Sequence, residues 1–198
     1  MKLDKNKEAV PALKKAILLN KNDADSHNDL GTIYSKFGRK EEAIRKYKNS
    51  IRKNSKNYRA YNNLGNVMLE IGDVDQAINN YNNAIKINYR YHKAHCNLGF
   101  ALRERGQLDE ADVAFKNAIA INPDYSDAYN CLGNTLKEQG TLKEAIAAYH
   151  RAIQIDPKNK DAFSNLGYAL RDQGNLAEAV VAYHHAIEID PTHKDGHF

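Results

Sequence analysis

Three side chains with metal-binding chemistry lie close together in the sequence: His92, His95 and Cys96. Spacings of three and four residues would place them on one face of a helix, and imidazole and thiolate groups are preferred zinc ligands. A tetrahedral zinc site needs four such ligands, and the sequence has no second cluster that would complete the set. We therefore predict no metal site and no cofactor, and we interpret these residues as part of the packing of a helix.

A second group of side chains could bind a peptide, because asparagines recur at one sequence register. Asn63, Asn97 and Asn165 each precede a Leu-Gly pair, and Asp29 and Cys131 hold the same place elsewhere in the chain. A carboxamide offers an acceptor oxygen and a two-proton donor, so it can pair with the backbone N–H and C=O groups of a peptide whatever that peptide's side chains are. The predicted peptide-binding residues, which include two asparagines one turn further along, are Asp29, Asn63, Asn66, Asn97, Asn134 and Asn165.

These asparagines have a second interpretation, which the sequence leaves open. In a chain rich in asparagine they could cap helices, face solvent or hydrogen-bond to one another. We favour a ladder that binds a peptide, because asparagine recurs at one register while the residues around it vary.

Basic residues are concentrated in the first part of the chain. Residues 1–57 hold 15 Lys and Arg against 7 Asp and Glu, whereas residues 58–198 hold 14 against 18. The densest group is Lys46, Lys48, Arg52 and Lys53. A nucleic-acid surface would need aromatic side chains beside such cations for base stacking, and the tyrosines here fall at positions expected in the core. We interpret the basic group as a solvated face and regard nucleic acid as an improbable partner.

Composition and motifs exclude several other classes. No run of about 18 apolar residues is present, so we predict no membrane-spanning helix. No glycine-rich phosphate-binding motif and no Ser, His and Asp set stand out, so we predict that the chain is not an enzyme. Two cysteines make no disulfide framework, and the first residues lack the apolar segment of a secretory signal. We therefore expect a cytoplasmic or other intracellular location.

The residues that carry this chemistry are set within an internal repeat of 34 residues. Leu-Gly pairs recur at Leu30/Gly31, Leu64/Gly65, Leu98/Gly99, Leu132/Gly133 and Leu166/Gly167. In every unit another glycine follows seven residues later, then an alanine, then an aromatic residue. The predicted repeats are 24–57, 58–91, 92–125, 126–159 and 160–193, preceded by the second helix of a partial repeat in 1–23 and followed by the start of another in 194–198.

Each unit has two sets of apolar residues at helical spacing, so each is predicted to form two amphipathic helices. The second glycine of the unit stands where a left-handed cap would end the first helix. Asn122-Pro123, Asp156-Pro157 and Asp190-Pro191 are expected to end the second helix, because a residue before proline disfavours helical dihedrals. One such hairpin cannot bury its apolar face alone, so the hairpins must stack into an all-α solenoid of antiparallel helix pairs.

The spacing and the residue types resemble the tetratricopeptide repeat (TPR), which places Leu-Gly, alanine, aromatic residues and proline at fixed offsets in 34 residues. The resemblance spans essentially the whole chain. The chain departs from the pattern at two proline positions, Ser55 and Tyr89, and Asp112 falls on an inner apolar position. The tryptophan slot of the family is filled by His27, Tyr61, His95, Tyr129 and Phe163.

Residues 61–85 and 130–153 look most like the long arrays that precede the catalytic region of O-linked N-acetylglucosamine transferases and their bacterial relatives. The resemblance implies that the helix pairs stack in a right-handed superhelix. It also implies that the first helix of each pair lines a concave groove, that the second helices cover the convex back, and that the asparagine ladder lies in the groove.

We therefore predict a non-catalytic scaffold for protein-protein interaction that binds an extended or helical peptide in the concave groove. One alternative is that the chain is the substrate-selecting arm of a larger glycosyltransferase. A second alternative is nucleic-acid binding by the basic N-terminal part. Because both ends fall within a repeat, we also expect that the chain comes from a longer array and that its apolar ends favour end-to-end self-association.

Overall fold

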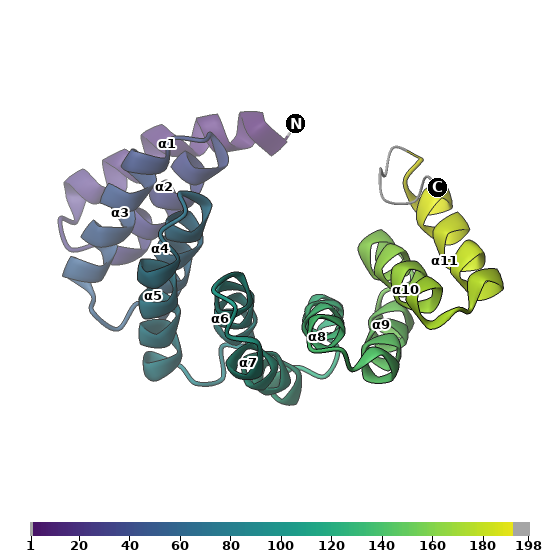
Figure 1. Ribbon diagram of the computed structural model, residues 1–198. Coiled ribbons are helices and arrows are strands. Elements are labelled where there is room, and N and C mark those ends of the chain that lie inside the picture. The colour runs from purple at the N-terminus through teal and green to yellow at the C-terminus, as the bar shows by residue number, and fades with distance from the viewer. Residues whose placement is uncertain (1, 192–198) are drawn as a thin grey trace. The chain divides into compact units, whose positions relative to one another are not determined.

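The structure, a computed structural model, describes the backbone of residues 2–191 and the side chains of residues 9–191. Eleven α-helices and no strands make up this described part, as the sequence predicted (Figure 1). In chain order the helices are α1 (Lys2–Leu19), α2 (Ala24–Lys36), α3 (Lys40–Lys53), α4 (Tyr58–Glu70), α5 (Val74–Ile87), α6 (His92–Glu104), α7 (Leu108–Ile121), α8 (Ser126–Glu138), α9 (Leu142–Ile155), α10 (Lys160–Gln173) and α11 (Leu176–Ile189).

The chain divides into two compact units, residues 1–101 and 102–198, and the division falls within α6. In unit 1, α2 pairs with α3 and α4 pairs with α5, while α3 also contacts α4. In unit 2, α8 pairs with α9 and α10 pairs with α11, while α9 also contacts α10. The predicted repeat boundaries and the right-handed superhelix stay predictions, and the predicted partial repeat 194–198 lies outside the described residues.

At four of the Leu-Gly pairs, those of Gly31, Gly65, Gly133 and Gly167, a tyrosine ring of the second helix lies directly on the glycine. A Cβ atom added at Gly65 would lie 2.6 Å from Tyr81 Cε1, and one at Gly133 would lie 2.5 Å from Tyr149 Cε1. No other residue could occupy these glycine positions without moving the ring. The paired helices therefore approach closely at the glycine, and the tyrosine fills the space between them.

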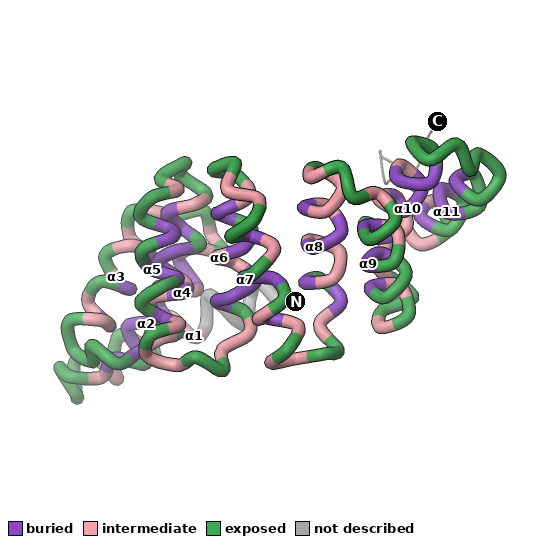
Figure 2. Tube along the Cα trace, turned by 60° about the horizontal axis from the view of Figure 1, so that its bottom comes forward, coloured by how far each residue is buried: buried purple, intermediate pink, exposed green. Residues whose placement is uncertain are grey.

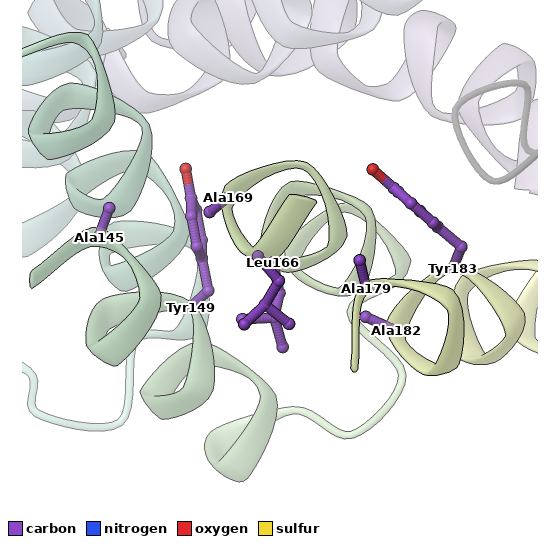
Figure 3. Packing of buried hydrophobic residues seen from close by; sticks show 8 residues of the cluster. Ala145, Tyr149, Leu166, Ala169, Ala179, Ala182 and Tyr183 are labelled. Carbon is purple, nitrogen blue, oxygen red and sulfur yellow. The ribbon is translucent and has the colours of Figure 1, made fainter. Parts of the chain in front are cut away.

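In unit 2 these tyrosines belong to a continuous core. Tyr149 of α9 lies beside Leu166 and Ala169 of α10, and Tyr183 of α11 packs against the other side of the same cluster (Figure 3). Each helix thus buries one stripe and exposes another, which Figure 2 shows as alternating buried and exposed stretches along the helices. No helix in the described range is both long and apolar enough to cross a membrane.

The first helices end at the predicted glycine caps, and α7, α9 and α11 end directly before the predicted Asn-Pro and Asp-Pro pairs. Every predicted cap glycine has a positive φ, for example +84° at Gly72 and +81° at Gly140, which confirms the left-handed cap. The second helices α3 and α5 end at the same register as α7, α9 and α11 although no proline follows them. Proline is therefore not what ends these helices.

An asparagine or aspartate directly after the helix forms a turn through its side chain. After α3, Asn54 Oδ1 accepts a hydrogen bond of 2.9 Å from the backbone N–H of Lys56, and after α5, Asn88 Oδ1 accepts one of 3.1 Å from Arg90. The same contact follows α9, from the N–H of Lys158 to Asp156. This turn, in which the side chain replaces a backbone acceptor, is common to repeats with and without proline.

Candidate functional site

The predicted peptide-binding residues lie on the first helices of the pairs and form two rows. The first row contains Asn63 of α4, Asn97 of α6 and Asn165 of α10, with Asp29 of α2 at the same register. The second row contains Asn66 of α4 and Asn134 of α8. Asp29 and Asn66 are exposed and the other four are partly exposed, so all six can reach a ligand. We call the surface that carries these residues in each unit the amide face of that unit.

A third set of asparagines lies behind the first row, and the sequence analysis did not single it out. This backing row is Asn28, Asn62 and Asn130. Asn28 and Asn62 are 8% and 3% exposed, so their side chains need hydrogen-bond partners within the protein. The signal that could have found them is the same as for the ladder, because each stands 34 residues, or a multiple of 34, from the others.

Each first-row asparagine donates to the backing row of the preceding first helix. The distances from Nδ2 to Oδ1 are 3.0 Å from Asn63 to Asn28, 2.9 Å from Asn97 to Asn62 and 2.9 Å from Asn165 to Asn130. Three bonds with the same donor and acceptor show that the repeat fixes this contact. The second interpretation of the sequence, that the asparagines bond one another, is thus confirmed for these residues; binding of a peptide by their remaining groups stays a prediction.

In unit 1 these bonds join into one chain across α2, α4 and α6. Asn28 Nδ2 donates to Asp29 Oδ1 at 3.3 Å, and Asn62 Nδ2 lies 3.5 Å from Asn63 Oδ1. Asn97 Nδ2 makes a further contact of 3.0 Å to Asn66 Oδ1. An ionised carboxylate can only accept hydrogen bonds, so Asn28 must donate to Asp29. Each later asparagine of the chain, up to Asn97, then donates to the one before it.

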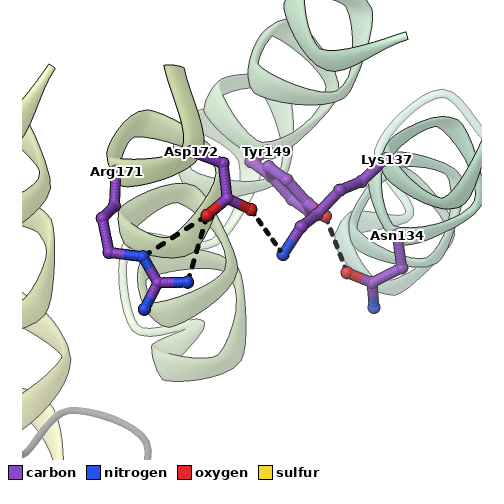
Figure 4. A network of polar contacts seen from close by, with 5 residues as sticks. All are labelled: Asn134, Lys137, Tyr149, Arg171 and Asp172. Carbon is purple, nitrogen blue, oxygen red and sulfur yellow. Dashed lines mark hydrogen bonds and ion pairs between the residues drawn. The ribbon is translucent and has the colours of Figure 1, made fainter. Parts of the chain in front are cut away.

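Tyrosines of the second helices hold the second row. The Tyr81 hydroxyl donates to Asn66 Oδ1 at 2.9 Å, and the Tyr149 hydroxyl donates to Asn134 Oδ1 at 2.7 Å (Figure 4). Both rings are almost completely buried, and burial raises the pKa of Tyr81 and of Tyr149 well above the ordinary value. The sequence assigned these tyrosines to the core, which is correct for the rings, but it did not find the role of their hydroxyl groups.

Charged residues accompany the amide face in unit 2. Asp172 of α10 lies between two cations, 3.0 Å from Arg171 and 3.4 Å from Lys137 of α8 (Figure 4). Burial alone would raise the pKa of Asp172, but the hydrogen bond from Arg171 and the charge of Lys137 outweigh it, so the pKa is lowered. Both cations also lie near the face of the Tyr168 ring, at 5.3 and 5.4 Å from its centroid.

The group His92, His95 and Cys96 lies at the start of α6. His95 is buried, its Nε2 lies 2.8 Å from the Tyr89 carbonyl oxygen, and its ring meets the Tyr89 ring edge-on at 5.1 Å. This contact explains the histidine by packing, as the sequence analysis proposed. Across the part of the chain that the structure describes, no three His, Cys, Asp or Glu side chains come together in a way that could hold a metal ion.

The basic group of α3 is exposed without an aromatic surface beside it. Lys48, Arg52 and Lys53 face solvent, whereas Tyr47, the aromatic residue of α3, is 2% exposed. Burial and the nearby charges of Arg45 and Lys14 lower the pKa of Lys46. A buried ring cannot stack on a nucleic-acid base, so Tyr47 does not supply the stacking surface that binding of a single strand requires.

Comparison with known families agrees with this architecture. Models described as TPR repeat match residues 36–72, 67–102, 101–140 and 133–170, and models described as tetratricopeptide repeat match residues 12–45 and 161–193. Together the matches span nearly all of the chain. A comparison with curated protein sequences finds no match.

Several solved structures share the fold. The chain is similar to YrrB, described as a TPR protein with an unusual peptide-binding site, with 26% identity over 93% of this chain and 95% of that chain and a TM-score of 0.71. It is also similar to MamA, with 29% identity over 81% of this chain and 94% of that chain and a TM-score of 0.72. PilF of Pseudomonas aeruginosa is 16% identical over 98% of this chain and 88% of that chain with a TM-score of 0.85, a likeness of fold alone.

Proposed function

Because the chain belongs to the tetratricopeptide repeat family, we propose that its amide face binds a peptide segment of a protein partner and that the chain has no catalytic activity of its own. Proteins of this family generally mediate protein-protein interaction and are usually non-catalytic. The likeness to YrrB supports a peptide as the ligand, since that protein is described by its peptide-binding site. The observation that carries the proposal is the accessible carboxamide that recurs at one register of the first helices, at Asn63 and Asn97 in unit 1 and at Asn165 in unit 2.

The spacing of the repeat suits an extended ligand. Neighbouring packed helices lie roughly 8–10 Å apart, and an extended chain advances about 3.3 Å per residue. One repeat therefore corresponds to roughly three residues of a bound peptide. A carboxamide of the first row would then meet a backbone group of every third ligand residue, and the ligand's own side chains would remain free to vary.

The proposal is tested by panning a random-peptide display library against the whole chain and measuring the affinity of the selected peptides by calorimetry. Asn63, Asn97 and Asn165 are then changed together to alanine. We expect a loss of affinity of about tenfold or more, since a hydrogen bond contributes about 1 kcal/mol and about 1.4 kcal/mol corresponds to a factor of ten.

The matched control changes three exposed asparagines of a second helix, Asn79, Asn82 and Asn83 of α5, to alanine. This variant loses the same number of carboxamides away from the amide face and should bind as the unmodified chain does. A library that yields no binding peptide, or an affinity that the Asn63, Asn97 and Asn165 variant leaves unchanged, would overturn the proposal.

A second proposal concerns self-association, which the apolar surface of α11 favours. Leu176 and Val180 are 63% and 53% exposed, and with Tyr183 and Ile187 they line a recess of about 330 Å³. An exposed apolar surface of this kind is typical of an interaction site, and we propose that it contacts a second copy of the chain. Sedimentation should show association that rises with concentration and is lost on Leu176→Ser with Val180→Ser. A monomer at every concentration would contradict it.

A further inference from the structure

The turns that follow α3 and α5 carry exposed cations and no acidic residue (Figure 1). Segments 53–59 and 87–93 occupy the same register of two successive repeats, and both lie in unit 1. Their basic side chains are exposed, and none forms an ion pair within the described residues. These side chains are Lys53, Lys56, Arg59, Arg90 and Lys93. We call the surface of the two segments the basic edge.

The other turns at this register have a different charge. In the turn before α2, Asp23 and Asp25 accompany Lys21. In unit 2, segments 121–127 and 155–161 together hold four acidic residues and two lysines. Lys160, one of these lysines, is paired with Asp190 at 2.5 Å. Because the repeat forms this turn with either balance of charge, the turn itself does not require the cations of the basic edge.

Three tyrosine rings lie among these cations. Tyr89 is 61% exposed, and its ring meets the His95 ring edge-on at 5.1 Å. Tyr58 and Tyr91 are partly exposed, and their rings meet edge-on at 4.9 Å, which brings the two turns together. The Arg59 guanidinium lies 5.7 Å from the centroid of the Tyr58 ring. Unlike the core tyrosines of the second helices, these rings reach solvent beside cations.

Tyr89 stands at a register where an aromatic ring is not needed. The same register holds Ser55 in the preceding repeat, and Pro123, Pro157 and Pro191 in the later ones. The turn after α5 is held by Asn88, whose Oδ1 accepts from the N–H of Arg90 at 3.1 Å, and not by the ring. Tyr89 thus presents a large ring at the surface, between cations, where the fold would accept a small residue.

We propose that the basic edge binds single-stranded nucleic acid, with its cations on the phosphates and the Tyr89 ring stacked on a base. Surfaces that bind single strands combine cations along the backbone with aromatic rings on which unpaired bases stack. An acidic protein segment would use the same cations, but it offers no base for the ring. The expectation that nucleic acid is an improbable partner considered the basic group of α3 and the core tyrosines, and it left out the rings of these turns.

The first measurement is binding of labelled oligothymidine and oligouridine, each of about 20 nucleotides, to the whole chain by fluorescence anisotropy. The two probes distinguish DNA from RNA, and binding of either supports the inference. On a single strand each neutralised phosphate contributes about −0.7 to the slope of log K against log salt concentration. Contacts from four or five cations should therefore give a slope of about −3.

The decisive variant is Tyr89→Pro, which removes the ring and introduces the residue that three other repeats carry. We expect the affinity for the single strand to fall about fivefold or more, the effect of losing one stacked base. The affinity for a duplex of the same length should not change, because its bases are already paired and stacked. Tyr89→Phe keeps the ring and should bind as the unmodified chain does. Tyr125→Ala removes a ring of unit 2 between Asp124 and Asp127 and should have no effect.

A second variant, Arg59→Gln with Arg90→Gln, removes two charges from the basic edge. Affinity at low salt should fall about tenfold, and the slope should become shallower by about 1.4, the contribution of two phosphates. Lys143→Gln with Lys158→Gln removes the same charge from exposed positions of unit 2 and should leave both values nearly unchanged.

The outcomes also separate this inference from the proposed function. The alanine variant of Asn63, Asn97 and Asn165 should bind the oligonucleotides normally, since those residues are not part of the basic edge. Circular dichroism and the urea midpoint check that each variant is folded, and Tyr89→Ser, which copies Ser55, replaces Tyr89→Pro if proline disturbs the turn. Absence of binding at low salt, or a single-strand affinity that loss of the ring leaves unchanged, would overturn the inference. Tighter binding of an oligoglutamate, insensitive to the ring, would identify an acidic protein segment as the ligand and would also overturn it.

Discussion

The amide face is built differently in the two units, although the repeat is the same. In unit 1 the first helices α2, α4 and α6 are joined by hydrogen bonds between asparagine side chains, which run from Asn28 to Asn97 and end on the carboxylate of Asp29. In unit 2, α8 and α10 share one amide bond, from Asn165 to Asn130, together with an ion pair between Lys137 and Asp172.

The difference follows from residues one turn beyond the second row. The register that holds Lys137 and Arg171 in unit 2 holds Ser35 and Leu69 in unit 1. The repeat thus fixes which positions meet across neighbouring helices, whereas the chemistry at each position is free to change. At this register unit 1 has the uncharged residues Ser35 and Leu69, and unit 2 has the cations Lys137 and Arg171. The following predictions test which properties the two units share and which they do not.

The largest effect is expected where the units are most alike, at the glycine beneath each tyrosine. Gly65→Ala in unit 1 and Gly133→Ala in unit 2 would each force a Cβ atom into a buried ring, at 2.6 and 2.5 Å. Each change should lower the free energy of unfolding by about 1–3 kcal/mol, the usual cost of overpacking. Urea denaturation followed by circular dichroism measures it.

The control for these variants is Gly72→Ala, at a position where no atom lies within 4 Å of the new Cβ but φ is +84°. Here only the backbone is strained, and the cost should be about 1 kcal/mol. If Gly65→Ala and Gly133→Ala lower the free energy of unfolding by very different amounts, the contact between glycine and tyrosine does not stabilise the two units in the same way.

The two units also show which features of the fold and of the site could be predicted from the sequence. The all-helical class, the helix pairs, the glycine caps and the buried tyrosines were predictable, because each depends on residue type at a periodic register. The recurrence of the backing row was visible in the sequence, but its burial was not, since Asn62 and Asn63 are adjacent and only the helix geometry shows that Asn62 is 3% exposed while Asn63 is partly exposed. The direction of each amide was not predictable either, because it depends on partners 31 or 35 residues away, such as Asn66 and Asn62 for Asn97. The helix ends before Asn122-Pro123, Asp156-Pro157 and Asp190-Pro191 were predicted correctly, whereas the turn that follows α3 and α5 without a proline was not predicted.

The next effect in size concerns Asp112 of α7, which occupies a register held by Ile78 in unit 1 and Ile146 in unit 2. Its Oδ2 atom pairs with Lys116 at 2.7 Å, but in the described part of the chain its Oδ1 atom is buried without a hydrogen-bond partner. Asp112→Ile should therefore raise the free energy of unfolding by about 1–2 kcal/mol, through burial of apolar surface and loss of the unsatisfied oxygen.

The same register gives the reverse experiment in unit 1. Ile78 is 8% exposed, and Ile78→Asp should destabilise the chain by more than Asp112→Ile stabilises it, because it buries a charge with no lysine placed to pair with it. Thermal unfolding of both variants measures the two changes in stability. A loss of stability in Asp112→Ile would mean that the pair with Lys116 matters more than the buried oxygen.

A smaller, pH-dependent effect should distinguish unit 1 from unit 2. The tryptophan slot of the family holds His27, Tyr61 and His95 in unit 1, and Tyr129 and Phe163 in unit 2. Burial, together with the charges of Lys46 and Lys53, lowers the pKa of His27 from its ordinary value of 6.5. The unfolded chain therefore binds a proton at this site at a higher pH than the folded chain does. Stability from this residue is present above about pH 6.5 and is lost as the pH falls below that value.

His27→Tyr is the matched variant for this prediction, because tyrosine fills the same slot in other repeats. Urea midpoints of both proteins are measured between pH 7.5 and 5. The midpoint of the unmodified chain should fall more steeply than that of the variant over this range. Equal slopes would show that protonation of His27 does not contribute to the difference between the units.

The smallest effect is expected at the ion pairs of unit 2, although they form the clearest difference from unit 1. Asp172 and Lys137 have side chains that are 38% and 34% exposed, so Asp172→Asn should cost only about 0.2–1 kcal/mol. Because the pKa of Asp172 is lowered, its contribution to stability is fully present above pH 3.8, the ordinary pKa of the group, and is lost as the pH falls through the lowered pKa.

Salt screens exposed charges, so the difference in stability between Asp172→Asn and the unmodified chain should shrink as sodium chloride is added. The loss caused by Asn62→Ala in unit 1, where the bonds are uncharged and buried, should stay constant over the same range. If salt changes the stability losses of Asp172→Asn and Asn62→Ala equally, the two units are not stabilised by different kinds of interaction. The charge in unit 2 would then matter for its ligand and not for its fold.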